Sequence, residues 1–74
     1  MTTKPLNYRG LACPLPIVKI SAVLKKAASG DQFEITADDA GFEKDITAWC
    51  RTTGNTLVGI TKTGRDITAT IIKK

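Results

Sequence analysis

The apolar residues of this chain switch between strand spacing and helix spacing, and this alternation leaves few folds available. Phe33, Ile35 and Ala37 alternate with polar residues, which is typical of a half-buried strand. Between residues 17 and 27, and again between 42 and 53, apolar residues recur about every three or four positions. That spacing predicts two amphipathic helices among strands.

The elements predicted along the chain follow the order β-α-β-α-β-β. The strands are expected at residues 5–9, 31–37, 57–63 and 67–73, and the helices at residues 13–30 and 41–53, with a turn at residues 64–66. This order predicts an α+β fold, a two-layer sandwich in which both helices cover one face of a mixed four-stranded sheet. A right-handed crossover would join the first two strands. Since 74 residues can close only one core, we expect a single domain over residues 1–74.

The sequence contains no histidine. This excludes the Cys-His and Ser-His-Asp arrangements of nucleophilic catalysis and most catalytic zinc sites, so we expect neither a metal nor a cofactor. Residues 1–9 lack the apolar core of a signal peptide, and no apolar run approaches the roughly 20 residues that span a bilayer. We therefore expect a cytoplasmic protein without membrane association, in which the two cysteines are free thiols.

Cys13 lies where a predicted strand gives way to a predicted helix. A thiol at a helix N-terminus faces the positive end of the helix dipole, which lowers its pKa and would also favour an anionic sulfur cargo. The proline that follows suits the first helical position and stiffens the loop. The supporting helix start consists of Pro14, Leu15, Pro16 and Ile17, in which the amides of Leu15 and Ile17 are the expected donors. Arg9 and Lys19 are the expected cationic contacts, and no general base is apparent.

Residues 10–16, Gly-Leu-Ala-Cys-Pro-Leu-Pro, resemble the Cys-Pro-x-Pro signature of the TusA/SirA-like sulfur-carrier family. The resemblance extends over essentially the whole chain. Further similar positions are Gly30-Asp31, Ala37-Asp38-Asp39, Asp45-Ile46 and Trp49-Cys50. Three departures, Asn7, Leu15 and Ala40, leave the thiol untouched but put in doubt which donor and acceptor are recognised.

The resemblance implies a cysteine, here Cys13, that receives sulfur as a persulfide or carries a thiosulfonate, and delivers it through direct protein contact. The implied donors are a cysteine desulfurase or a rhodanese, and the implied acceptor is a DsrE-type or other relay protein. The implied pathways are tRNA thiolation, molybdenum-cofactor synthesis and sulfur oxidation. We expect a monomeric carrier and no enzyme in the strict sense.

Two other functions stay open at this point. The net charge of +4 suggests a nucleic-acid-binding or regulatory module. The basic residues are scattered, however, and no aromatic residues are interleaved with a cluster of them, so no direct nucleic-acid contact is expected. A dithiol redox protein would need Cys50 to be accessible, whereas its place on an apolar helix stripe predicts core packing. Trp49 is also expected in the core, with an exposed edge as the alternative. Asp38 and Asp39 are interpreted as helix caps.

Overall fold

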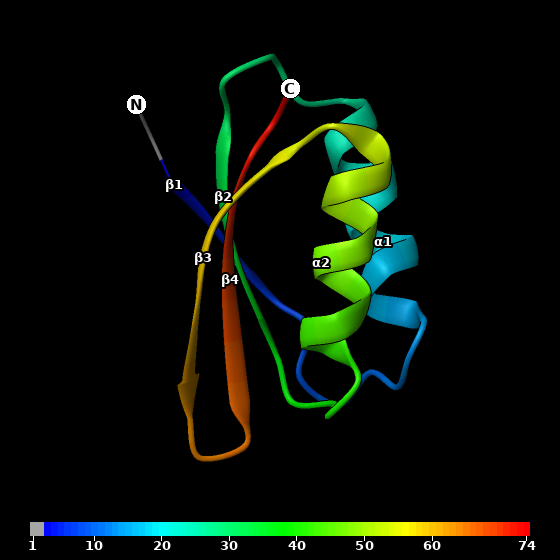
Figure 1. The fold of residues 1–74 in the computed structure, drawn as a ribbon, viewed down its shortest axis with the longest axis vertical. Helices are drawn as coiled ribbons and strands as arrows, with labels where there is room; N and C mark the ends of the chain where they lie inside the picture. The colour runs from blue at the N-terminus through cyan, green and yellow to red at the C-terminus, as the bar shows by residue number, and fades with distance from the viewer. Residues whose placement is uncertain (1–2) are drawn as a thin grey trace.

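The computed structural model describes residues 3–74, which form four strands and two helices in the predicted order. Both helices pack on the same side of the sheet, so the molecule has two layers (Figure 1). The two-layer α+β prediction is confirmed. The elements are β1 (Thr3–Asn7), α1 (Leu15–Lys25), β2 (Gln32–Ala37), α2 (Phe42–Thr53), β3 (Thr56–Thr63) and β4 (Asp66–Ile72).

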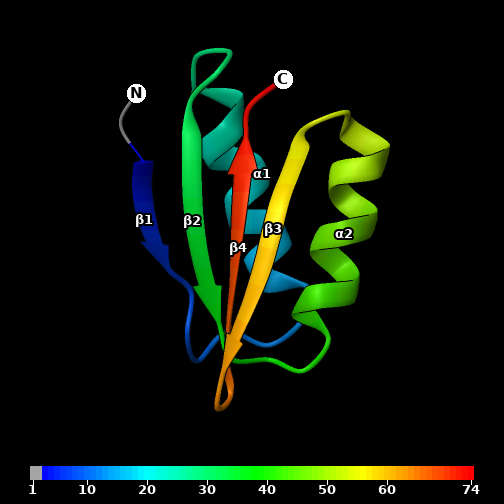
Figure 2. The same ribbon diagram turned by 60° about the vertical axis from the view of Figure 1, so that its left-hand side comes forward.

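The four strands form one mixed sheet in the order β1-β2-β4-β3 (Figure 2). β1 runs parallel to β2, with Leu6 opposite Ile35. β4 pairs antiparallel with both β2 and β3, so Ile35 also lies opposite Ala69. Because β1 and β2 are parallel, the loops that follow them leave from the same edge of the sheet, and this places the β1–α1 loop beside the β2–α2 loop.

β1 begins and ends two residues earlier than the predicted strand at residues 5–9. Tyr8 still donates its backbone N–H to the Thr36 carbonyl, at 2.7 Å, but the chain then turns. Gly10 has φ of 83°, a conformation that glycine adopts without steric cost. The turn at Gly10 therefore takes Arg9 out of the strand.

α1 ends at Lys25, well before the predicted stop at Gly30. Its last turn tightens, because the N–H of Ala27 donates to the carbonyl of Leu24, three residues back. The Lys73 ammonium donates to that same carbonyl at 2.6 Å, which gives this carbonyl at the end of the helix a second hydrogen bond. Gly30 belongs instead to the turn before β2, where its N–H donates to the Lys73 carbonyl.

The core lies between the helices and the facing side of the sheet. Its largest fully buried side chains include Phe33, Phe42, Ile20, Ile35, Ile46 and Ile71. Burying side chains of this size stabilises a fold by roughly 1.5–3 kcal/mol each, which is what holds the two layers together. Neither α1 nor α2, the helices of the described residues, has the length and apolar character that a membrane crossing requires.

Candidate functional site

The loops that follow β1 and β2 are joined by a hydrogen bond at their common edge of the sheet. The Gly10 amide in the first loop donates to the Asp38 carboxylate in the second, at 3.0 Å. Asp39 accepts a hydrogen bond from the Gly41 amide at 3.1 Å, within the second loop. The predicted capping role is therefore wrong in detail: the N-cap of α2 is Gly41, without a side-chain cap, and the two aspartates order the loops instead.

Cys13 lies in the first loop, with an exposed side chain, two residues before α1 begins. Pro14 occupies the N-cap position and is exposed, whereas Pro16 is fully buried and attaches the start of α1 to the body of the protein. The N–H of Leu15 donates to the Ala12 carbonyl at 2.8 Å. The N–H of Ile17 donates to the Pro14 carbonyl at 3.1 Å. Both amides that were expected to face the sulfur are therefore already engaged within the turn.

The thiol of Cys13 donates a hydrogen bond to the carboxylate of Asp45, in the first turn of α2. This hydrogen bond, partial desolvation and the negative charges of Asp45 and Asp39 together raise the pKa of the Cys13 thiol above its ordinary value. The expectation of a lowered pKa is thus wrong, because the hydrogen bond to Asp45 stabilises the neutral thiol. The expectation that no base accompanies the thiol is also wrong.

Gly41, in the second loop, lies close to Cys13. A β-carbon built on Gly41 would lie 3.9 Å from the Cys13 Cβ and 3.2 Å from an oxygen of Asp39. A side chain at position 41 would thus touch Cys13 and crowd Asp39. The sequence analysis did not predict that Gly41 or Asp45 lies at the site. For Asp45 a signal was available, because it lies at the start of the second predicted helix and is one of the positions similar to the sulfur-carrier family.

The predicted cationic contacts, Arg9 and Lys19, remain predictions, and Arg9 is already paired with a carboxylate. The Arg9 guanidinium donates to Asp66 at 2.9 Å and to the side-chain oxygen of Asn7 at 3.2 Å. The pairing with Asp66 raises the pKa of Arg9 and lowers that of Asp66. Lys19 is exposed on α1. The charged groups that raise the pKa of the Cys13 thiol are carboxylates.

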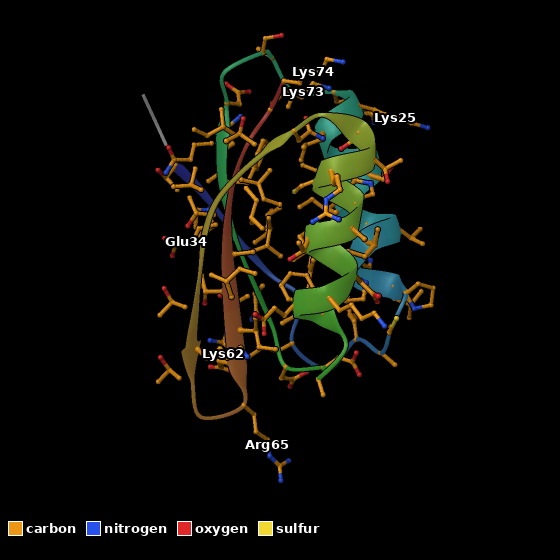
Figure 3. All side chains as sticks on the ribbon, viewed as in Figure 1. Lys25, Glu34, Lys62, Arg65, Lys73 and Lys74 are labelled. Atoms are coloured by element: carbon orange, nitrogen blue, oxygen red, sulfur yellow. The ribbon has the colours of Figure 1, made fainter. Side chains whose placement is uncertain are left out.

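A shallow apolar groove of about 600 Å³ starts beside the thiol, at Pro14, and runs along α1 towards Trp49 of α2. Val18, within it, is 58% exposed, and Leu15 nearby is 47% exposed. Lys25 lies at the far end of the groove and points away from the sheet (Figure 3). The other lining residues are Ile17, Ser21, Ala22 and Lys26. Trp49 is half-buried, so one part of it packs on the core while another part borders this groove.

Cys50 is buried in the core, only 3% exposed, and desolvation raises its pKa to about 11. The prediction of core packing for this residue is confirmed. A dithiol pair with Cys13 would require a thiol that solvent and partner molecules can reach, and Cys50 does not meet this requirement. Both cysteines are free thiols in the structure.

Several known proteins similar to this chain are described as sulfur carriers. The family model described as Sulfurtransferase TusA matches residues 4–74. Sulfur carrier protein TusA of Allochromatium vinosum is 40% identical over 53 residues, covering 72% of this chain and 70% of that protein. YrkI of Bacillus subtilis is 39% identical over 61 residues, covering 82% and 81%. A relative in Aquifex aeolicus, 37% identical over 59 residues or 80% of this chain, is longer, and the chain spans only 30% of it.

Among solved structures, a SirA-like protein of Desulfitobacterium hafniense superposes with a TM-score of 0.80, covering 96% of both chains, at 16% sequence identity. At this identity the likeness concerns the fold alone. It matches the βαβαββ order and the mixed sheet described above.

Proposed function

Because the chain belongs to the TusA family, we propose that it is a sulfur carrier in which the Cys13 sulfur accepts a sulfur atom from one protein and passes it to another. The observation that supports this most is the exposed Cys13 thiol, held in a proline-stiffened loop with the Asp45 carboxylate in contact. We propose further that the carrier works as a monomer in the cytoplasm and needs no cofactor.

The transfer is an exchange of one sulfur atom without net oxidation. The Cys13 thiol loses its proton to Asp45 or to water, and the thiolate attacks the outer sulfur of the donor persulfide. A new S–S bond forms on Cys13, the donor S–S bond breaks, and the donor leaves as a thiolate with the electron pair. In delivery, an acceptor thiolate attacks the outer sulfur in turn, and Cys13 leaves as the thiolate and recovers its proton.

The donor in this proposal is a cysteine desulfurase or a rhodanese, and the acceptor is a DsrE-type or another relay protein. The cargo is a persulfide, or a thiosulfonate if the protein serves sulfur oxidation. The same chemistry would also serve tRNA thiolation or molybdenum-cofactor synthesis. In all of these cases the partner must present its own sulfur at the exposed edge where Cys13 lies.

Intact-protein mass spectrometry tests the carrier function. After incubation with a persulfide-loaded rhodanese or with inorganic polysulfide, we expect the mass of the wild-type protein to rise by one sulfur atom. Cys13→Ser should stay unloaded, while Cys50→Ala, which removes the other thiol, should load like the wild type. Unchanged wild-type mass, or loading of Cys13→Ser, would contradict the proposal.

We propose that the groove along α1 receives the partner protein. The groove is apolar near Cys13 and ends at Lys25 and Lys26, and it therefore suits a partner that presents an apolar side chain near its reactive sulfur and carboxylates farther away. The salt bridges found within residues 3–74 involve neither of these lysines. Since α1 has 11 residues and helices rise 1.5 Å per residue, the carboxylates should lie about 16 Å from the partner's sulfur.

Two sulfur donors separate docking from chemistry. We expect Val18→Ser, and the double variant Lys25→Glu with Lys26→Glu, to slow loading from a persulfide-loaded rhodanese roughly tenfold, as removing interface contacts of about 1–2 kcal/mol does. Loading from inorganic polysulfide should not change. Val58→Ser is the matched control, because Val58 is 57% exposed but lies on β3, outside the groove. Equal slowing with both donors, or none with either, would contradict docking at this groove.

A further inference from the structure

The surroundings of Cys13 are unusual for a residue that carries an anion. The thiol contacts the carboxylate of Asp45 on α2, and the charge of Asp39 in the loop before α2 acts on it as well. Arg9, in the same loop as Cys13, is paired with Asp66 at the start of β4. Within residues 3–74, the charged groups shown to act on the thiol are thus these two carboxylates.

We propose that Asp45 is a catalytic residue that weakens the hold of Cys13 on its cargo, so that the loaded carrier readily gives its sulfur away. This inference rests on the proposed function, since it concerns the loaded state of the same thiol. In this role, Asp45 shifts the equilibrium between loaded and unloaded protein towards the unloaded form.

The unloaded and loaded states interact with Asp45 in opposite ways. The neutral thiol of Cys13 donates its proton to the carboxylate, in a charge-assisted hydrogen bond that stabilises the unloaded protein. A deprotonated persulfide has no proton to donate, and its negative charge is repelled by that of Asp45. A thiosulfonate is an anion too, so the argument holds for either cargo.

The size of this bias follows from Coulomb's law. Two unit charges about 4 Å apart in a site as open to water as this one change an equilibrium constant by about fivefold. Asp39, whose carboxylate also binds the Gly41 amide, adds a smaller contribution. A bias of this size lowers the affinity for cargo without preventing loading, which suits a protein that must both receive and deliver.

An exchange equilibrium with glutathione persulfide and glutathione measures the bias directly. The ratio of loaded to unloaded protein is read by intact-protein mass spectrometry at fixed concentrations of both glutathione species. For Asp45→Asn, which keeps the shape and loses the charge, we expect the loading constant to rise about fivefold. Glu43→Gln is the matched control, because Glu43 is in the same turn of α2 but pairs with Lys62, and this variant should load like the wild type.

The pH dependence distinguishes a charge effect from a change in structure. The difference between wild type and Asp45→Asn should be largest where the persulfide is deprotonated and the Cys13 thiol is still protonated. At lower pH both sulfurs carry protons and can donate to Asp45, and at higher pH both are anions, so the difference should shrink on either side. In parallel, the midpoint for alkylation of Cys13 should move to lower pH in Asp45→Asn.

A second measurement varies the ionic strength, and its wild-type arm does not depend on the folding of a variant. Because salt screens exposed charges, raising the ionic strength should increase loading of the wild type and change that of Asp45→Asn much less. Equal loading of both proteins at every pH and ionic strength would overturn the role of Asp45 while leaving Cys13 as the carrier. Failure of the wild type to load at all would instead overturn the proposed function.

Discussion

The two cysteines of this protein carry the same thiol in opposite surroundings. Cys13 is exposed in a loop and donates to a carboxylate, whereas Cys50 is buried among apolar side chains. The pKa of both is raised, but for different reasons: a hydrogen bond to Asp45 is the largest cause for Cys13, and desolvation is the cause for Cys50. The direction of a pKa shift alone therefore does not identify the thiol that can react with partners. The exposure of the thiol to solvent and the carboxylate beside it distinguish Cys13 from Cys50.

Alkylation of the native protein offers the sharpest way to break this comparison. Iodoacetamide reaches Cys13 directly, whereas Cys50 reacts only when the core opens. For a stability of about 5 kcal/mol, the lower end for folded domains, Cys50 should react at least roughly 10³-fold more slowly. Peptide mapping by mass spectrometry after timed quenching gives both rates. In urea the rates should converge, and similar rates without urea would mean that Cys50 is accessible.

Serine substitution extends the comparison to stability. Cys50→Ser buries a hydroxyl among apolar side chains, and we expect it to lower the free energy of unfolding by about 1–3 kcal/mol. Cys13→Ser keeps a donor for Asp45 at an exposed position, so its effect should stay within about 0.5 kcal/mol. Urea denaturation followed by circular dichroism measures both. Equal decreases in the free energy of unfolding for the two variants would show that the burial of Cys50 does not contribute to stability beyond what an exposed cysteine does.

Most of the fold could be predicted from periodicity, because the buried positions of β2, α2 and β4 repeat at strand or helix spacing. The errors fall at the ends of β1 and α1. There the outcome depends on hydrogen bonds between segments far apart in the sequence, such as Gly10 to Asp38 and Lys73 to Leu24. No local pattern contains these contacts.

The site could be predicted only in part: its cysteine was found from the sequence, but the carboxylate beside it was not. The Cys-Pro-x-Pro motif located the exposed thiol, since the motif and the thiol lie in one short segment. Asp45 is 32 positions away from Cys13 in the sequence. Only the parallel pairing of β1 with β2, which sets the two loops side by side, brings Asp45 into contact with the sulfur. The sign of the charge around Cys13 was therefore a property of the fold.

Gly41→Ala gives the smallest and most local test, because it changes the surroundings of one cysteine only. The added methyl group would make ordinary contact with the Cys13 Cβ but would press on Asp39, at 3.2 Å. Gly41 has a negative φ of −81°, which alanine also adopts, so the backbone should not be strained. We expect alkylation of Cys13 to slow about twofold, equivalent to ~0.4 kcal/mol in activation free energy, while the rate for Cys50 stays the same. If both rates changed together, the methyl group would be acting on global stability and not on the surroundings of the Cys13 thiol.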